Sequence, residues 1–400
     1  MIDWIFSVIL YLGTIIYGIY LDTNQHLSNV SRKRSYYVTW LFVFLCFGYM
    51  VGADWRSYEL AYLEGIGLTR FLTEPISWAI FEYVPNVIPD FWLFSGLTKC
   101  LYLYTTILLA KRITTRWLSA VAILIPGVLA FMLIQNPMRY MFSLTAVNVS
   151  LIYLYDFLKY DSKSIKSLVM VIIFATISGM CHNSSFLFIA LLPLALLSKK
   201  LANINKSTLF ILYMTITVLT SNVSYLAFLK DSVVSFAQGF FSMSDYSSYE
   251  IESNEAIFSI GNILRIVFFV FVLRTKNTVV NKYDNGRIVY GLTLIYFFLS
   301  RILILIPTGF RLALPFVIFY TIYTIYLIDT KWAYYGKMII IYSLLAFTSQ
   351  LWNSYDLIPY TNSIPYIVAG HKPYQERDFY NLNEYKARTG NTIYLNIHER

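Results

Sequence analysis

Four hundred residues are more than one soluble domain usually holds, but the composition excludes a set of soluble domains. Hydrophobic residues make up 58% of the chain and charged residues only 13%, about half the share of an ordinary soluble protein. The chain also carries 35 Tyr and 30 Phe, an excess typical of aromatic belts at membrane interfaces and of surfaces that stack on rings. We therefore expect an all-α, polytopic integral membrane protein.

The net charge of +9 does not indicate a nucleic-acid partner. The basic residues occur in short clusters between apolar stretches and not along one basic face. Cys46, Cys100 and Cys181 lie in apolar stretches, which indicates neither a disulfide framework nor a metal site. The first 20 residues have no basic start and no cleavage site, so they predict a retained helix and not a signal peptide.

In chain order, twelve apolar stretches approach the roughly 20 residues that a helix needs to cross a hydrocarbon core of ~30 Å. They are 2–21, 37–53, 91–110, 117–134, 138–157, 167–181, 184–198, 207–228, 257–273, 288–306, 312–328 and 337–353. We expect about twelve transmembrane helices, within a range of roughly 10–14. The short pair at 167–181 and 184–198 flanks His182 and forms either two full helices or a re-entrant hairpin.

The basic residues separate the two sides of the predicted membrane domain. They gather in alternate loops, near 32–34, 111–116, 159–166, 199–206, 274–287 and 331–337. The positive-inside rule makes this the cytoplasmic face and places both termini outside. The outer face then carries loops near 54–90 and 229–256. We expect one membrane domain over residues 1–353 and an external tail over 354–400.

Ionisable side chains within the predicted spans are candidate functional residues, because each costs about 2.5–3.5 kcal/mol to insert. Arginines occur in or at the outer ends of spans at Arg139, Arg265, Arg301 and Arg311. Guanidinium groups bind phosphate oxygens through two parallel hydrogen bonds, so arginines at headgroup depth suit a lipid phosphate or pyrophosphate. The alternative is that each arginine snorkels or pairs with a nearby carboxylate or carbonyl. Arg301 and Arg311 flank a short Pro-Thr-Gly connection and can lie close together.

The first outer loop begins with Asp54, directly after the second expected span. An acid flanked by Trp55 and Tyr58 can orient or deprotonate a sugar hydroxyl. Alternatively, Asp54 caps a helix or pairs with Arg56. Further along, Glu74-Pro75 opens a segment whose apolar spacing predicts an amphipathic helix in the membrane interface.

His182 is the one histidine that lies between apolar spans. Its ordinary pKa of ~6.5 suits a proton acceptor near neutral pH, although a packed histidine bonded to a carbonyl explains it equally well. A second His or Cys at ligand spacing is missing, which argues against zinc. The sequence also has no Walker P-loop, no Gly-x-Ser-x-Gly elbow and no Asp-x-Asp pair. An enzyme of this kind would use a donor with a good leaving group and would need no metal or cofactor.

Several short motifs resemble those of one family. Gly52-x-Asp54-Trp55-x-x-Tyr58 is similar to the first motif of the EpsG-like branch of the Wzy polysaccharide polymerases. Segments similar to the family's later motifs follow in the same order as in the family. They are Glu74-Pro75 leading to Phe81-Glu82, Gln135-Asn136-x-x-Arg139, Gly179-Met180-x-His182-x-Ser184, the helix start at Arg311, and Ile364-Pro365-Tyr366. One position departs from the pattern, because Gly48 stands where many members have arginine.

The resemblance implies a GT-C-like architecture and a metal-independent glycosyltransferase. Such an enzyme polymerises undecaprenyl-pyrophosphate-linked oligosaccharides into O-antigen or capsule chains at the outer face, with a chain-length regulator as a further partner. Donor and acceptor would both be lipid-linked. On this hypothesis His182 or Asp54 is the catalytic base. The predicted substrate-binding residues are Arg56, Tyr58, Glu74, Arg139, Arg265, Arg301 and Arg311.

Two other functions stay open on the sequence alone. A lipid-phosphate-dependent transferase that adds a single sugar would also use an acid in the first outer loop. A flippase for lipid-linked sugars would place charges along a cavity that reaches both faces, and Lys99, in the middle of an expected span, fits that alternative best.

Overall fold

The computed structural model describes residues 2–24, 29–50, 54–65, 72–134, 137–160, 165–220, 259–303, 310–353 and 360–370, with residues 383 and 386. In these ranges the regular structure is helical, and extended pairing is limited to one antiparallel bridge between Gly48 and Asn362. The chain forms two compact units. Unit 1 comprises Met1–Thr145 with Ile340–Arg400, and unit 2 comprises Ala146–Ile339.

Each of the twelve expected spans overlaps a helix or consecutive helical segments in the described residues. They are α1 (Ile2–Thr23), α2 (Val30–Cys46), α6 (Phe91–Ile113), α7 (Trp117–Leu124) continued by η2 (Ile125–Leu129) and α8 (Ala130–Leu133), α9 (Met138–Lys159), α10 (Ile165–Cys181), α11 (Phe186–Leu196), α13 (Lys206–Thr220), α15 (Ile260–Lys282), α16 (Gly286–Ile302), α17 (Phe310–Ile328) and α18 (Ala333–Asn353). In the described part of the chain, α1, α6, α9 and α17 each contain a stretch long and apolar enough to cross a membrane. These helices indicate a membrane protein, whereas the number of spans stays a prediction.

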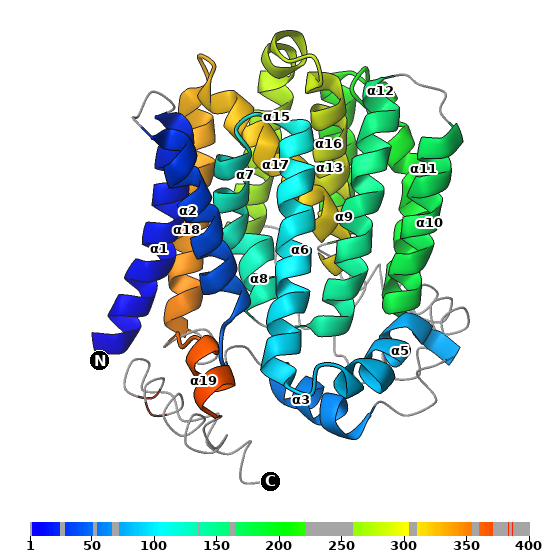
Figure 1. Cartoon of the computed structure of the whole chain (residues 1–400). Coiled ribbons are helices and arrows are strands. Elements are labelled where there is room, and N and C mark those ends of the chain that lie inside the picture. The colour runs from blue at the N-terminus through cyan, green and yellow to red at the C-terminus, as the bar shows by residue number, and fades with distance from the viewer. Residues whose placement is uncertain are drawn as a thin grey trace. The chain divides into compact units, whose positions relative to one another are not determined.

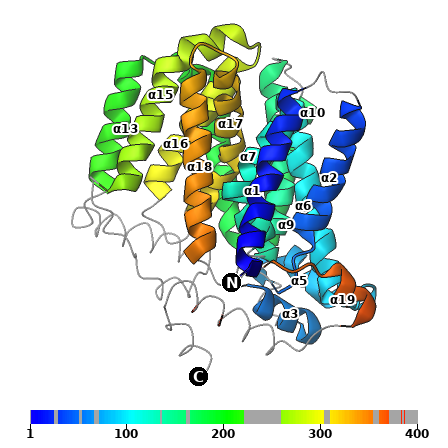
Figure 2. The same ribbon diagram turned by 90° about the vertical axis from the view of Figure 1, so that its left-hand side faces the viewer.

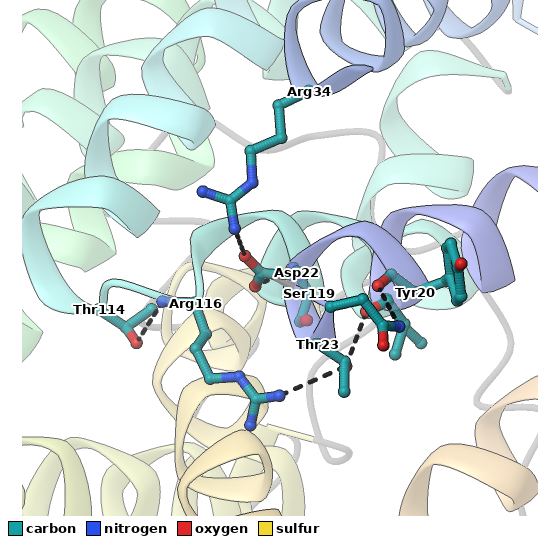
Figure 3. Close-up of polar contacts among 9 residues, drawn as sticks. Tyr20, Asp22, Thr23, Arg34, Thr114, Arg116 and Ser119 are labelled. Carbon is teal, nitrogen blue, oxygen red and sulfur yellow. Dashed lines mark hydrogen bonds and ion pairs between the residues drawn. The ribbon is translucent and has the colours of Figure 1, made fainter. Parts of the chain in front are cut away.

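At one end of unit 1, a buried carboxylate joins three helices. Asp22, near the end of α1, accepts a hydrogen bond from Arg34 of α2 at 3.1 Å and another from the backbone N–H of Ser119 in α7 at 3.0 Å (Figure 3). The first N–H groups of a helix have no partner within it, so Asp22 satisfies one of them in α7. Arg116 also reaches the end of α1, where it donates to Thr23 at 3.4 Å.

The opposite end of unit 1 is formed by short helices. Figures 1 and 2 show α3 (Trp55–Glu64), α5 (Pro75–Tyr83) and α19 (Ile364–Ala369) together below the longer helices. The segment after Glu74 forms the expected helix, α5, which buries Phe81 and exposes Tyr83, while its place in the membrane interface stays a prediction. Within unit 1 the basic loops and the first outer loop therefore lie at opposite ends, as the charge pattern predicts.

Unit 2 is organised around α16, which packs against α12 (Ser198–Leu201), α13, α15 and α17. A glycine permits one of these contacts. A Cβ atom on Gly291 would lie 2.1 Å from the carbonyl oxygen of Ser198, so a larger residue there would push α12 and α16 apart. As in unit 1, the ends of α13 and α16 and the start of α15 lie away from the basic loops.

The second and fourth predicted spans differ from the helices that form for identifiable local reasons. The second ends at Cys46 and not at residue 53, because the chain leaves the helix to pair with the C-terminal segment at Gly48. The fourth is interrupted by a π-helical turn over Ile125–Leu129, where Pro126 cannot donate the hydrogen bond of a regular helix.

Candidate functional site

A buried aromatic cluster lies at the short-helix end of unit 1. Its members are Tyr49, Met50, Trp55, Tyr62, Phe81, Phe91, Trp92, Phe94 and Met138, with Tyr58 and Tyr366 among the partly buried residues packed against it. Asp54 and Arg139 are predicted site residues that directly adjoin cluster members in the chain. Asp54 precedes Trp55, and Arg139 follows Met138. The cluster therefore fixes the backbone on which both polar side chains stand.

Three of the predicted site residues come together beside this cluster. The carboxylate of Glu74 accepts a hydrogen bond from Arg139 at 2.5 Å, and the Arg139 guanidinium lies 6.0 Å from the centre of the Tyr58 ring. Glu74 is buried, with 2% of its side chain exposed, whereas Arg139 keeps 21% of its side chain exposed. Arg139 thus does pair with a carboxylate, yet a guanidinium has five N–H donors and can bind an anion as well.

Asp54 stands at the N-terminus of α3, where its backbone carbonyl accepts hydrogen bonds from the Ser57 hydroxyl at 2.9 Å and from the Tyr58 N–H at 3.3 Å. Asp54 is half-buried. Arg56 belongs to α3, but its side chain lies outside the described part, so the expected Asp54–Arg56 pair stays a prediction. The motif residues Gly52, Gln135 and Asn136 and the predicted outer loop 229–256 also lie outside the described residues.

The aromatic cluster also holds a carboxylate that sequence reasoning missed. Glu59 accepts a hydrogen bond from the indole N–H of Trp92 at 3.1 Å, which ties α3 to α6. Next to it, the Tyr62 hydroxyl donates to the backbone carbonyl of Ile88. Burial, and then the charge of Asp90, raise the pKa of Tyr62 to about 12, so this hydroxyl keeps its proton at physiological pH.

Two of the predicted arginines converge in unit 2. Arg301 of α16 and Arg265 of α15 both donate to the side-chain oxygen of Asn262, Arg265 at 3.5 Å. Arg301 donates further to the Thr217 carbonyl at 3.4 Å and to the Thr220 hydroxyl at 3.1 Å, both in α13. Only 1% of Arg301 is exposed, whereas Arg265 is half-buried. Arg265 is therefore the more accessible cation of the pair.

Sequence reasoning did not find Asn262, although a signal was present. The hydroxyl of Ser259 accepts from the Asn262 N–H at 3.3 Å and so caps α15. A helix that begins there places Asn262 and Arg265 three residues apart, on one face. Arg311 is half-buried at the start of α17. The connection 304–309 lies outside the described residues, and proximity of Arg301 and Arg311 stays a prediction.

His182 lies at the turn between α10 and α11. Its backbone is extended, its N–H donates to the Ser178 carbonyl at 3.0 Å, and its carbonyl accepts from the Ser185 N–H at 2.8 Å. A Cβ atom on Gly179 would lie 2.4 Å from the ring of Phe186, so the glycine of this motif lets α10 and α11 approach. The half-buried imidazole is thus presented at the end of a tight helix pair.

Comparison with known proteins gives one positive result. Neither a curated protein nor a solved structure matches the chain. In the residues that the structure describes, no group of three His, Cys, Asp or Glu side chains could hold a metal ion. The model of the EpsG family matches residues 33–367, which span most of the chain and every site residue above, and the protein therefore belongs to the EpsG family.

Proposed function

We propose that this protein polymerises undecaprenyl-pyrophosphate-linked oligosaccharide repeat units into O-antigen or capsule chains, at the outer face of the bacterial cytoplasmic membrane. Membership of the EpsG family indicates a membrane protein of polysaccharide biosynthesis. The polymerase reaction, its lipid-linked substrates, twelve spans in a GT-C-like arrangement, external termini and a chain-length regulator as a partner are our proposal.

The reaction needs three things from the protein. An acceptor hydroxyl attacks the anomeric carbon of the donor sugar, the bond from that carbon to pyrophosphate breaks, and the hydroxyl proton passes to a base. The pyrophosphate leaves with its lipid and with the bonding electron pair. The enzyme must therefore bind the leaving group, hold two lipid-anchored substrates and accept one proton.

The observation that carries the proposal is the convergence of Arg265 and Arg301 on the side chain of Asn262. Two guanidinium groups that share one acceptor repel each other, and a dianion bound at the half-buried Arg265 would relieve this repulsion. They sit where α13 ends, α15 begins and α16 ends, away from the basic loops of unit 2. Arg139 offers a third, partly exposed guanidinium in unit 1.

Two residues are candidates for the base. His182 carries an imidazole, a common proton acceptor in enzymes, at the turn between α10 and α11, and Asp54 stands at the start of α3 beside the aromatic cluster. His182→Ala and Asp54→Asn separate them: replacing the base should reduce long chains to single repeats while the amount of protein in the membrane stays normal. If long chains keep their normal length in His182→Ala cells, the histidine is structural.

The first experiment is a gel of the surface polysaccharide of the host, with the gene deleted and then restored. We expect the ladder to shrink to core plus one repeat and to return on complementation. A ladder of normal length that lacks one sugar in every rung would instead indicate a single-sugar transferase. Accumulation of lipid-linked repeats on the cytoplasmic face would indicate a carrier, for which Lys99, buried in α6, would be the first residue to test.

A further inference from the structure

The C-terminal segment 360–366 closes over the end of α2 in unit 1. The Tyr360 hydroxyl donates to the carbonyl of Phe44 at 2.5 Å, and the Asn362 amide donates to the carbonyl of Val43 at 2.8 Å. Backbone pairing continues beyond the helix, where the Ser363 N–H donates to the carbonyl of Phe47 at 2.6 Å. We call residues 360–366 the C-terminal clasp.

The clasp supplies what the helix end lacks. The last four carbonyls of an α-helix have no partner within the helix, and in α2 these begin at Val43. Two of them accept hydrogen bonds from clasp side chains, although the clasp is more than 300 residues distant in sequence. The Tyr360 N–H also donates to the Ser7 hydroxyl at 2.9 Å, which anchors the clasp on α1. Burial raises the pKa of Tyr360, so its hydroxyl stays a donor.

A chain of ring contacts leads from the clasp to α3. The ring of Tyr366 stacks on Tyr49 with centres 4.3 Å apart, and Tyr49 lies 4.8 Å from Trp92. Trp92 lies 5.3 Å from Trp55 and donates to Glu59, so it holds both the first turn and the middle of α3. Asp54 is the residue directly before Trp55.

From these contacts we infer that the C-terminal clasp positions the Asp54 end of α3 for glycosyl transfer, so that Tyr360, Asn362 and Tyr366 are positioning residues. This inference rests on the proposed function, which supplies the reaction that α3 would serve; the contacts that link the clasp to α2 and α3 do not depend on it. Residues 360–366 of the predicted external tail thereby belong to the proposed site in unit 1.

The physical effect of the clasp can be measured without any assay of activity. Hydrogen exchange of the full-length protein in lipid nanodiscs would be compared between wild type and Asn362→Ala. We expect roughly fivefold faster exchange for the amides of α3, because the clasp loses the hydrogen bonds that the Asn362 side chain donates to Val43 and Tyr360 and accepts from the N–H of Ile364. The amides of α7, at the opposite end of unit 1, should exchange at the wild-type rate.

Asn353 provides a matched control. Its side-chain amide also donates to a helix carbonyl, that of Ser349 at 3.0 Å, but it lies on the exposed end of α18 outside the clasp. Asn353→Ala should therefore leave exchange in α3 unchanged. Tyr360→Phe removes only the hydroxyl of the clasp tyrosine and keeps its ring on Phe44, so it tests the hydrogen bond apart from the packing.

The second measurement is the turnover of purified lipid-linked repeats by the same variants. We expect kcat of Asn362→Ala to fall about tenfold with KM unchanged, since a misplaced catalytic group slows the reaction without weakening binding. Unchanged exchange in α3 would overturn the inference, and so would faster exchange with a normal kcat. If the wild-type protein polymerises nothing, the proposed function fails, and the exchange experiment alone then decides whether the clasp holds α3.

Discussion

Asp22–Arg34 and Glu74–Arg139, two ion pairs in the described part of unit 1, use the same groups in different surroundings. In Asp22–Arg34 and in Glu74–Arg139 the carboxylate is buried and the guanidinium keeps about a fifth to a quarter of its side chain exposed. Asp22 uses its second oxygen for the backbone of α7, so that pair joins three helices. Arg139 instead lies beside Tyr58, next to the aromatic cluster. An arginine–carboxylate pair therefore does not identify a site by itself, whereas its neighbours do.

The largest effect that would test this contrast is expected from Arg139→Lys. Lysine keeps the charge next to Glu74 but cannot bind phosphate through two parallel hydrogen bonds. We expect polymerisation by purified protein to fall about a hundredfold, with normal amounts of protein in the membrane. Arg34→Lys is the matched variant at the other pair and should polymerise at the wild-type rate. Equal losses in both variants would show that Arg139 is as structural as Arg34.

Much of the helical framework could be predicted, because apolar length and charged loops are properties of the sequence itself. All twelve expected spans overlap helical segments in the described residues, and α5 begins at Pro75 as its motif predicts. The exit of α2 at Cys46 could not be predicted. It depends on hydrogen bonds from Tyr360 and Asn362, and no local sequence pattern indicates a partner more than 300 residues away.

The candidate site shows the same division. The sequence alone points to isolated arginines in apolar stretches, because inserting each one into a membrane costs free energy. Two of these arginines do share an acceptor. Their partners were not evident, because Asn262 and Thr220 are ordinary polar residues whose importance comes from helix packing. Glu59 was missed for the same reason, since only the fold brings Trp92 to it.

A smaller effect, and of a different kind, is expected from Asp22→Asn. The variant loses a charged acceptor for Arg34 and weakens the support of α7, so we expect the protein to lose about 1–3 kcal/mol of stability. Thermal melting of the purified protein measures this loss. Turnover per folded molecule should stay normal, because the pair lies at the end of unit 1 opposite α3. A loss of turnover without a loss of stability would contradict the structural role of Asp22.

In unit 2 two arginine variants should separate a residue that supports the fold from one that binds substrate, and the expected change in turnover is moderate. Arg301 is buried and makes three described hydrogen bonds, whereas Arg265 is half-buried and makes one. Arg265→Lys should lower turnover about tenfold at normal stability, because lysine cannot bind phosphate through two parallel hydrogen bonds as a guanidinium does. Arg301→Lys should mainly lower the melting temperature, because a lysine cannot reach all three acceptors. The opposite assignment of effects would make Arg301 the group that binds the substrate.

The smallest effect concerns Tyr62, which reports on the aromatic cluster beside Glu74 and Arg139. Its pKa in the folded protein is raised to about 12, above the ordinary value of 10.0. A raised pKa in the folded state means that the stability it contributes is fully present below pH 10 and is lost as pH rises towards 12. Tyr62→Phe leaves the Ile88 carbonyl without its donor, and we expect the melting temperature to fall by about 2–4 °C at neutral pH.

Raising the pH provides the stronger test of that residue. Between pH 10 and 12 the wild-type protein should lose the advantage that the Tyr62 hydroxyl provides, so the two melting temperatures should converge. Each protein is its own control at neutral pH, and other tyrosines titrate equally in both. A difference in melting temperature that stays constant up to pH 12 would mean that burial and the charge of Asp90 do not raise the pKa of the Tyr62 hydroxyl. The cluster would then support Asp54 and Arg139 through packing alone.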